Sequence, residues 1–309
     1  METPTPFEQA PEALAAFAGR DDLWLKREDV NEIGVFKWRG ALPVVEELAR
    51  RGHEAVVTAS TGNHGAAVAW ACRQAGIRAV VFVPPGAAEP KLANLDRLGA
   101  DVRVAGHDLD EAKEFARTYA EQAALQFFED GAEPLQYDAY GAIGAEAIEQ
   151  CPLPPAAVVT PIGNGALAGG IGVAVARLAP GATRVGVVAR EMPVMADSHA
   201  AGYAVEAQNG STIADGLAVR VAIPLAVERL RAALDVMVRV SEREIALSLA
   251  ACHDAGVPIE PSAAAAVAAV RRRPEIGEGG GPIVLVLTGR NVDATLVERA
   301  RQHVHSFPD

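Results

Sequence analysis

Residues 34–40 read Gly34-Val35-Phe36-Lys37-Trp38-Arg39-Gly40 and place a lysine between two aromatic side chains. Lysine is rare in this chain, which contains only four among its 309 residues. An apolar setting disfavours the charged form of an ammonium group. The neutral amine that results is a nucleophile and can form a Schiff base with a carbonyl compound. Alternatively, Lys37 buries only its aliphatic stem beneath Trp38 and keeps its ammonium group in water.

The composition is that of an acidic globular protein. Half of the residues are hydrophobic, enough for a substantial core, and the length suits one large or two moderate domains. A formal net charge of -12 argues against a surface that binds nucleic acid. The sequence contains no run of about 18 apolar residues, the length that would indicate a membrane span. Because Met1-Glu2-Thr3-Pro4 is neither basic nor apolar, as a signal peptide would be, we expect a cytoplasmic protein without nucleic-acid or membrane partners.

Short β-branched runs alternate with alanine-rich helical patterns along the chain. Continuous apolar strands that alternate with helices indicate mainly parallel sheets with helices on both faces. The expected fold class is therefore α/β. The expected strands are 55–59, 78–83, 101–104, 157–162, 184–189 and 282–287, and the expected helices are 43–51, 66–75, 91–98, 110–123, 241–255 and the alanine-rich run 262–270.

The first of three informative strand ends is Ala59-Ser60-Thr61-Gly62-Asn63-His64-Gly65, which follows an expected strand and opens an expected helix. In open α/β sheets, ligands bind at the carboxyl ends of strands. The backbone N–H groups at a helix start favour an anion, and a substrate carboxylate would suit them. The alternative is that Ser60 or Thr61 simply caps the helix, which is compatible with binding.

The second strand end is the glycine-rich stretch from Pro161 to Gly170, which again lies between a strand and a helix. Glycines allow the backbone to approach a phosphate closely, and the helix start stabilises its charge. Alternatively, the glycines serve a tight turn and close helix packing. A rival interpretation is a dinucleotide fingerprint, since Gly163-x-Gly165-x-x-Ala168 matches it and Glu191 follows the next strand. That interpretation predicts a nicotinamide dehydrogenase and leaves the first half of the chain without a purpose.

The third strand end is Leu285-Val286-Leu287-Thr288-Gly289-Arg290-Asn291. A neutral hydroxyl such as that of Thr288 can share a hydrogen bond with an aromatic ring nitrogen, but it cannot stabilise a proton there as a carboxylate does. A pyridine nitrogen left unprotonated is a weaker electron sink. Elimination or replacement at Cβ of a substrate is then favoured over transamination. The alternative is an ordinary cap at the end of a strand.

Taken in order, the motifs around Lys37, Ser60 to Gly65, Gly163 to Leu167 and Thr288 to Asn291 resemble the fold-type II pyridoxal-phosphate enzymes, the superfamily of the tryptophan synthase β chain. The resemblance is closest to the threonine/serine dehydratases, and four ordered motifs are far more specific than any one alone. It spans nearly the whole length of the chain. Further matching blocks are 23–29, 83–85, Lys91, 98–100, 212–219 and Glu260-Pro261-Ser262.

This resemblance implies a role for each motif residue. Lys37 forms the Schiff base with pyridoxal 5'-phosphate and later moves the α-proton of an amino-acid substrate, and Phe36 packs beside the cofactor. The ring hydroxyl is bound by Asn63 and the pyridine nitrogen faces Thr288. The residues expected to bind the phosphate are Gly163, Asn164, Gly165, Ala166 and Leu167, and those expected to bind the substrate carboxylate are Ser60, Thr61, Asn63 and His64.

The resemblance also implies an architecture of two α/β domains with parallel sheets and the cofactor in the cleft between them. Residues 1–51 and 134–309 would form the large domain, and residues 52–133 a small mobile domain. Homodimers are common in the family, so a homodimer is expected.

The chain departs from the family pattern at several positions. Val35 stands where serine is usual, and Asn164 interrupts a run that is often all glycine. The combination of Asn164 with Thr288 also resembles the pattern of threonine synthases. Thr61 stands where racemases of this fold place a serine opposite the lysine, so a catalytic part for its hydroxyl is a further expectation. Val188 and Ala189 lie where such racemases keep a metal-binding glutamate.

No metal site is expected. The three cysteines, Cys72, Cys151 and Cys252, are far apart and odd in number, which suits reduced thiols better than disulfides or zinc ligands. The expected activity is a threonine/serine dehydratase, that is, an ammonia-lyase that removes water from a hydroxy amino acid to give a 2-keto acid and ammonia. The alternatives are a threonine synthase-like enzyme or an amino-acid racemase on the same scaffold, or a non-catalytic amino-acid-binding homologue.

Overall fold

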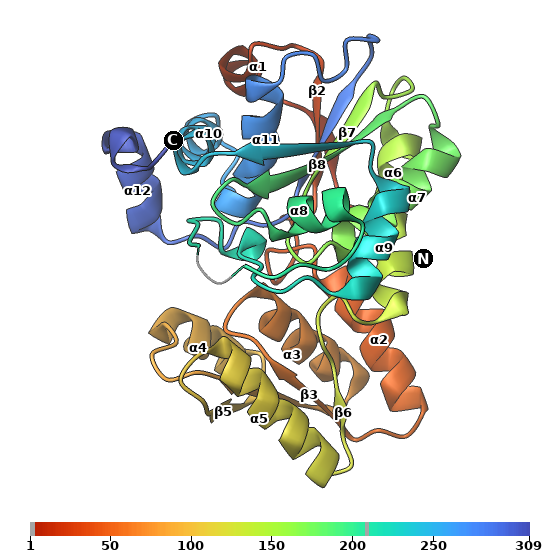
Figure 1. Ribbon diagram of the computed structural model, residues 1–309, viewed down its shortest axis with the longest axis vertical. Coiled ribbons are helices and arrows are strands. Elements are labelled where there is room, and N and C mark those ends of the chain that lie inside the picture. Colours follow the sequence, from red (N-terminus) through yellow and green to blue (C-terminus); the bar gives the residue numbers. More distant parts are fainter. Residues whose placement is uncertain (1–3, 208–209) are drawn as a thin grey trace. The chain divides into compact units, whose positions relative to one another are not determined.

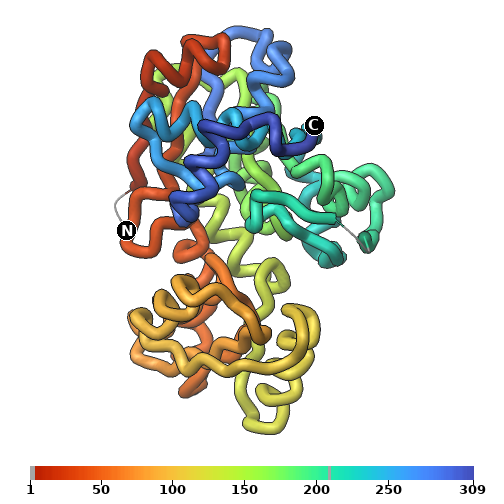
Figure 2. Tube along the Cα trace, turned by 90° about the vertical axis from the view of Figure 1, so that its left-hand side faces the viewer, coloured from red at the N-terminus to blue at the C-terminus, as the bar shows by residue number. Residues whose placement is uncertain are grey.

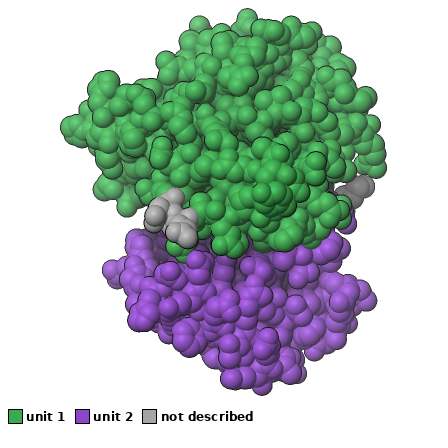
Figure 3. Space-filling model, in the orientation of Figure 1, with its two compact units in different colours: residues 1–35, 140–309 green, residues 36–139 purple. Residues whose placement is uncertain are grey.

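The computed structural model describes residues 4–207 and 210–309. Part of the start of the chain, on which the signal-peptide argument rests, lies outside these residues. Contacts divide the chain into two compact units (Figure 3): unit 1 comprises residues 1–35 and 140–309, and unit 2 comprises residues 36–139. The domain division expected from the sequence, with residues 52–133 as a small mobile domain, stays a prediction.

Unit 1 is built on a six-stranded sheet with the strand order β1-β2-β10-β7-β8-β9 (Figure 1). All neighbouring strands are parallel except β1, which pairs with β2 in the antiparallel sense. The central strands are buried on both faces, as expected for continuous apolar runs. The strand bounds are β1 Phe7–Gln9, β2 Leu23–Arg27, β7 Ala157–Pro161, β8 Thr183–Ala189, β9 Val236–Val240 and β10 Ile283–Leu287.

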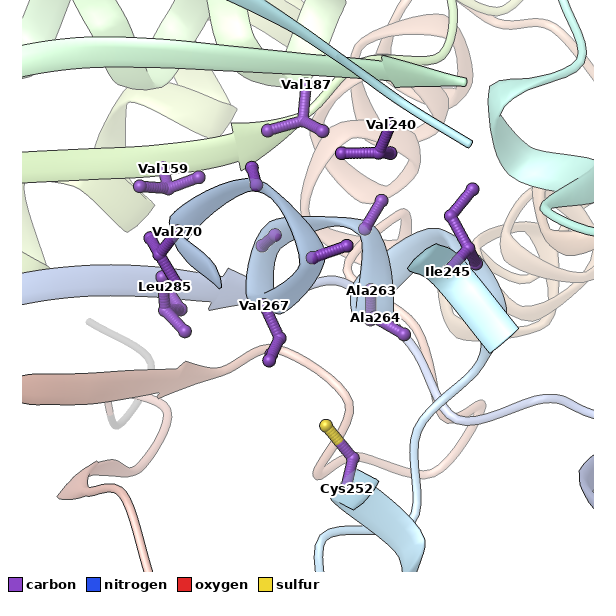
Figure 4. Packing of buried hydrophobic residues seen from close by; sticks show 14 of the residues in the cluster. Val159, Val187, Val240, Ile245, Cys252, Ala263, Ala264, Val267, Val270 and Leu285 are labelled. Carbon is purple, nitrogen blue, oxygen red and sulfur yellow. The ribbon is translucent and has the colours of Figure 1, made fainter. Parts of the chain in front are cut away.

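The alanine-rich run expected to be a closely packed helix is helix α11, Pro261–Arg272. Its residues from Pro261 to Val270 are all buried. Figure 4 shows this helix among Val159, Val187, Val240 and Leu285, which come from four strands of the sheet. Small side chains let the helix backbone approach the sheet, and branched side chains from the strands fill the remaining space.

The other helices of unit 1 surround the same sheet. Their bounds are α1 Glu12–Ala18, α7 Ala166–Leu178, α8 Val194–Ala201, α9 Pro224–Ala233, α10 Glu242–Asp254 and α12 Ala294–Gln302, with short 3-10 turns η1 Asp215–Leu217 and η2 Val304–Ser306. Helix α10 begins with a capping box, in which Ser241 and Glu244 satisfy each other's backbone N–H groups. Helix α6, Pro134–Gln150, begins in unit 2 and ends in unit 1.

Unit 2 is built on a four-stranded parallel sheet with the order β5-β4-β3-β6. The chain path of this unit can be followed in Figure 2 from orange to yellow. A small core of Val57, Val80, Phe82 and Ala116 lies between the sheet and helix α5. The bounds are β3 Ala55–Ala59, β4 Arg78–Val83, β5 Asp101–Val104, β6 Gln126–Phe127, α2 Trp38–Arg50, α3 Asn63–Ala75, α4 Glu89–Arg97 and α5 Leu109–Gln122.

The expected α/β class, with mainly parallel sheets, is thus confirmed. No helix within the described residues is both long enough and apolar enough to cross a membrane.

Candidate active site

Lys37 lies directly before helix α2, in unit 2. Its side chain is 15% exposed, and its ammonium nitrogen lies 5.0 Å from the centre of the Phe36 ring. The indole of Trp38 packs edge-on against Trp70, and its Nε1 is buried without a hydrogen-bond partner among the described residues. An aromatic neighbour, as expected from the sequence, is therefore present beside Lys37. Its amine, however, is held by a charge that the sequence pattern did not indicate.

That charge is the carboxylate of Asp130, whose Oδ2 lies 2.5 Å from Lys37 Nζ. The other oxygen, Oδ1, accepts a hydrogen bond of 3.0 Å from Gln136 and lies 3.6 Å from Nδ1 of His64. Burial alone would raise the pKa of Asp130. The positive charge of Lys37 and the hydrogen bonds from Lys37 and Gln136 outweigh burial, so the pKa of Asp130 lies well below its usual range. Asp130 is therefore ionised at neutral pH.

His64, expected from sequence to help bind a substrate carboxylate, lies in the first turn of α3 and is 7% exposed. Its ring packs edge-on against Phe128 at 5.0 Å, and its Nε2 lies 3.4 Å from the Phe128 carbonyl oxygen. Burial lowers the pKa of His64 most, and the nearby positive charge of Lys37 lowers it further, whereas Asp130 acts in the opposite direction. His64 is therefore neutral at neutral pH.

The loop from Ser60 to Gly62 connects strand β3 to helix α3. Neither Ser60 nor Thr61 caps the helix, because Gly62 is the N-cap residue and no side chain caps it. Ser60 Oγ instead accepts a 3.1 Å hydrogen bond from the Gly62 N–H. The first turn of α3 also contains no acidic side chain that would neutralise the positive end of the helix dipole. Together with Asn63, this start of α3 has the character of an anion site.

In unit 1, the glycine-rich loop connects β7 to α7, and two of its glycines are required by their surroundings. A Cβ atom at position 163 would lie 2.2 Å from the Gly216 carbonyl oxygen. Gly165 has φ +97, in the left-handed region, and is the N-cap of α7. The side chain of Asn164 accepts a 3.0 Å hydrogen bond from the Ala166 N–H. The loop therefore presents backbone and a helix start, as a phosphate site requires, with Asn164 folded over one donor.

Thr288 directly follows strand β10 and is 3% exposed. Its Oγ1 is buried and has no hydrogen-bond partner among the residues that the structure describes. A buried hydroxyl without a partner costs about 1–3 kcal/mol, which points to a group supplied from outside the chain. The next residue, Gly289, is fixed by the Glu260 N–H, which donates to its carbonyl at 2.9 Å, and by a bridge to Val35.

The predicted site residues therefore fall into two sets. Lys37, Phe36 and residues 60–64 belong to unit 2, where Asp130 connects Lys37 with His64. Residues 163–167 and Thr288 belong to unit 1, where β7 and β10 are parallel neighbours. Their loops lie at the same carboxyl edge of the sheet, the usual place for ligands in an α/β fold.

Metal ligands and thiols contribute little to these sets. The described residues contain no group of three or more His, Cys, Asp or Glu side chains placed to hold a metal ion. The cysteines are free, and burial raises the pKa of both Cys72 and Cys252 to about 12. Buried thiols with such pKa values are unreactive at neutral pH.

Comparisons with known proteins identify the class. Residues 1–289 match the family model described as pyridoxal-phosphate dependent enzyme. The chain is 34% identical over 283 residues to the L-threonine ammonia-lyase of Thermotoga maritima, covering 90% of this chain and 69% of that protein. Its fold is similar to that of threonine deaminase isoform 2 from Solanum lycopersicum, with a TM-score of 0.90, 29% identity and coverage of 97% and 83%. A maize serine racemase has a TM-score of 0.88, 25% identity and coverage of 98% and 93%.

The chain thus belongs to the family of pyridoxal-phosphate dependent enzymes, and its cofactor is pyridoxal 5'-phosphate. The expected fold type and cofactor are confirmed. The glycine-rich loop after β7 is accounted for by this family, and a nicotinamide dehydrogenase is not needed to explain it. The unpartnered hydroxyl of Thr288 and the glycine backbone at positions 163 and 165 fit the polar ring nitrogen and phosphate of this cofactor.

Proposed function

We propose that this protein is a threonine/serine dehydratase, an ammonia-lyase that eliminates water from L-threonine or L-serine and yields a 2-keto acid and ammonia. The observation that carries the proposal is the neutral, unpartnered hydroxyl of Thr288 in a pyridoxal-phosphate enzyme. A hydroxyl does not stabilise a proton on the pyridine nitrogen as a carboxylate would, which favours early loss of a β-substituent over transamination. The likeness to the L-threonine ammonia-lyase of Thermotoga maritima supports the choice of substrate.

The residues of this chain would hold the cofactor as follows. Lys37 is proposed to bind its aldehyde carbon, and Phe36 to pack beside it. Asn63 would donate to the ring hydroxyl, and Thr288 would share a hydrogen bond with the pyridine nitrogen. Gly163, Asn164, Gly165, Ala166 and Leu167 would bind the phosphate, with the side chain of Asn164 turning away from the Ala166 N–H. When bound, pyridoxal phosphate supplies an electron-withdrawing ring that acidifies the α-proton of an attached amino acid.

The substrate carboxylate is proposed to bind at the start of helix α3. Ser60, Thr61 and Asn63 supply hydroxyl and amide groups there, and the helix dipole favours an anion. His64 would contribute as a neutral imidazole, since burial lowers its pKa. Once substrate has displaced it, the amine of Lys37 would accept the α-proton, and the β-hydroxyl would leave with a proton from a nearby acid.

A substrate panel tests the proposal. The purified protein should absorb in the visible and should release keto acid from L-threonine or L-serine, with little activity on phosphate esters of hydroxy amino acids. Preferred turnover of a phosphate ester would instead indicate a threonine synthase-like enzyme. Binding of the amino acid without turnover would indicate a non-catalytic homologue.

Racemase activity is the second candidate, and the likeness to the maize serine racemase favours it. Thr61, which stands where racemases of this fold place a serine, would be the group opposite Lys37. Chiral analysis of serine after incubation separates the two activities, because a dehydratase consumes L-serine without accumulating D-serine. Thr61→Ser should increase any D-serine formed if Thr61 acts weakly in that position.

The cytoplasmic location and the homodimeric state are likewise proposals. The homodimer is proposed because the chain resembles the fold-type II pyridoxal-phosphate enzymes, among which homodimers are common. Sedimentation of the purified protein would test the homodimer, since it has twice the mass of the 32.2 kDa chain. Fractionation of the source cells would test the location.

A further inference from the structure

The carboxylate of Asp130 lies beside the amine of Lys37 although 93 residues separate them in the chain. Asp130 follows the two-residue strand β6, which pairs in parallel with β3. Because the carboxyl ends of parallel strands lie at one edge of a sheet, this pairing brings Asp130 to the loop that opens helix α3. The side chains of Lys37 and Asp130 are 15% and 21% exposed, so their attraction is only partly screened by water.

The remaining contacts of Asp130 fix the direction in which its carboxylate points. Gln136 donates to Oδ1 at 3.0 Å, and its own Oε1 accepts from the Gly131 N–H at 2.7 Å. The hydroxyl of Tyr137 donates to the Gly131 carbonyl at 2.8 Å, which ties the same loop to α6. With Oδ1 held in this way, Oδ2 is directed at Lys37.

His64 is the other titratable group that faces Asp130, with Nδ1 3.6 Å from Oδ1. Burial lowers the pKa of His64, so its ring carries no charge at neutral pH. Lys37 is therefore the cation paired with this carboxylate. The ring face of Phe36, 5.0 Å from Nζ, attracts the same ammonium group.

We propose that Asp130 is a positioning residue for Lys37: its Oδ2 holds the side-chain amine in place and stabilises the ammonium group that forms when the freed amine accepts a proton. The inference rests on the proposed role of Lys37 as the amine that binds the cofactor. The carboxylate neither gains nor loses an atom. When Lys37 accepts a proton from the substrate Cα, that proton stays on Nζ, and the new positive charge faces Asp130. This ion pair would favour proton removal and return Lys37 to the same position in each turnover.

Zero-length cross-linking tests the pair in the full-length protein after hydroxylamine has removed the cofactor. A water-soluble carbodiimide activates a carboxylate, an amine in contact attacks it, and an amide forms as the reagent leaves as a urea. We expect peptide mapping to show an amide between Lys37 and Asp130, and we expect Lys37→Arg to lack it. Absence of this link in the cofactor-free protein contradicts the proposal.

The same cross-linking reaction on the cofactor-loaded protein separates the pairing of Lys37 with Asp130 from the role of Lys37 in binding the cofactor. If Lys37 carries the cofactor, its amine is occupied and the link is lost. A link that forms equally well with cofactor bound overturns the proposed role of Lys37 but leaves its pairing with Asp130 intact.

Competitive labelling gives a second readout that does not depend on activity. Trace acetic anhydride reacts with neutral amines, so the label on Lys37 relative to Lys91 reports how well the ammonium form is held. We expect Asp130→Asn to raise this ratio about three- to tenfold, the effect of losing a charge-assisted hydrogen bond. Asp130→Glu should restore a ratio close to that of the natural protein. A purely structural role would leave Asp130→Glu as strongly labelled as Asp130→Asn, and would overturn the proposal.

The matched control is Asp138→Asn, the same change at an exposed position on helix α6. It should leave the labelling ratio unchanged. If Asp130→Asn gives no folded protein by circular dichroism, the cross-link and the Asp130→Glu variant decide the matter. An unchanged ratio in folded Asp130→Asn contradicts the inference.

Discussion

The loop before helix α2 contains a charged group with a charged partner, whereas the loops after strands β7 and β10 contain glycine backbone and an unpartnered hydroxyl. Around Lys37, in unit 2, the charged group has a partner in Asp130, which is itself oriented by Gln136. After β7 and β10, in unit 1, the described residues 163–167 and 288 include no such charge pair. There the hydroxyl of Thr288 is buried without a partner among the described residues. At Gly163, any side chain would clash with the Gly216 carbonyl oxygen.

The difference follows from what each region has to do. An amine that accepts a proton during turnover becomes positively charged, and a nearby carboxylate stabilises that charge. The loops after β7 and β10 are instead proposed to bind a ring nitrogen and a phosphate, for which glycine backbone and an unpartnered hydroxyl are suited. Changes in the two regions should therefore have different consequences.

Lys37→Arg should abolish turnover, with a loss of about 10³-fold or more in keto acid release, because proton transfer and covalent catalysis are both removed. Arginine keeps the positive charge opposite Asp130, so the variant should remain folded. The measurement is keto acid release from L-threonine, alongside circular dichroism. A folded Lys37→Arg protein with full turnover would end the assignment.

Gly163→Ala should destabilise unit 1, because the new Cβ would lie 2.2 Å from the Gly216 carbonyl oxygen. Overpacking of this kind costs about 1–3 kcal/mol, and cofactor affinity should fall with it. The matched control is Gly181→Ala, since no atom lies within 4 Å of a Cβ at that position. Its free energy of unfolding should change by no more than about 0.5 kcal/mol. Equal effects of the two variants in urea unfolding would show that the loop is not tightly packed.

Thr288→Val should separate stability from cofactor binding. Without cofactor, replacing an unpartnered buried hydroxyl with a methyl group should leave stability unchanged or raise it by about 1 kcal/mol. With cofactor, the lost hydrogen bond should weaken binding about tenfold. Thermal unfolding with and without pyridoxal phosphate measures both effects. Thr288→Ser keeps the hydroxyl and is the control, and a Thr288→Val protein with undiminished cofactor affinity would contradict the assigned partner.

His64 should make stability depend on pH in the mildly acidic range. Burial lowers the pKa of His64 in the folded state, so the unfolded chain binds the proton more readily. The stability from a neutral His64 is fully present above the unfolded pKa of about 6.5 and is lost as pH falls through the folded pKa. Urea unfolding across this range should show a shallower pH dependence for His64→Gln. His303→Gln, at an exposed position, is the control for removing a histidine, and identical curves for His64→Gln and the natural protein would refute the interpretation.

The sequence was informative where one local pattern determines the structure. The expected strands at 55–59 and 78–83 agree with the observed ones, because continuous apolar runs in a parallel sheet need no long-range information. The expected strand at 101–104 also agrees, although β5 alternates polar and apolar residues at the edge of its sheet. Helix α6 was not predicted, because Gly141 and Gly144 interrupt its pattern. The structure explains one of them, since a Cβ at position 144 would lie 2.9 Å from the Ile171 carbonyl oxygen on α7.

The roles proposed for the candidate residues rest on the motifs, and the structure adds what the motifs could not indicate. Asp130 was missed because its strand, β6, has only two residues and leaves no periodic pattern. Its pairing with Lys37 depends on β6 lying beside β3, a contact between distant parts of the chain. The hydrogen bond of Asn164 to Ala166 and the lack of a partner for Thr288 are also properties of the folded chain.

The central claim is that the amine of Lys37 carries the cofactor. Borohydride reduction of the purified protein, followed by peptide mapping, measures it directly because reduction fixes the imine as a stable secondary amine. The account predicts a pyridoxyl group on Lys37 and none on Lys26, Lys91 or Lys113. A reduced label on any of those three lysines, or a protein that takes up no pyridoxal phosphate at all, would contradict it.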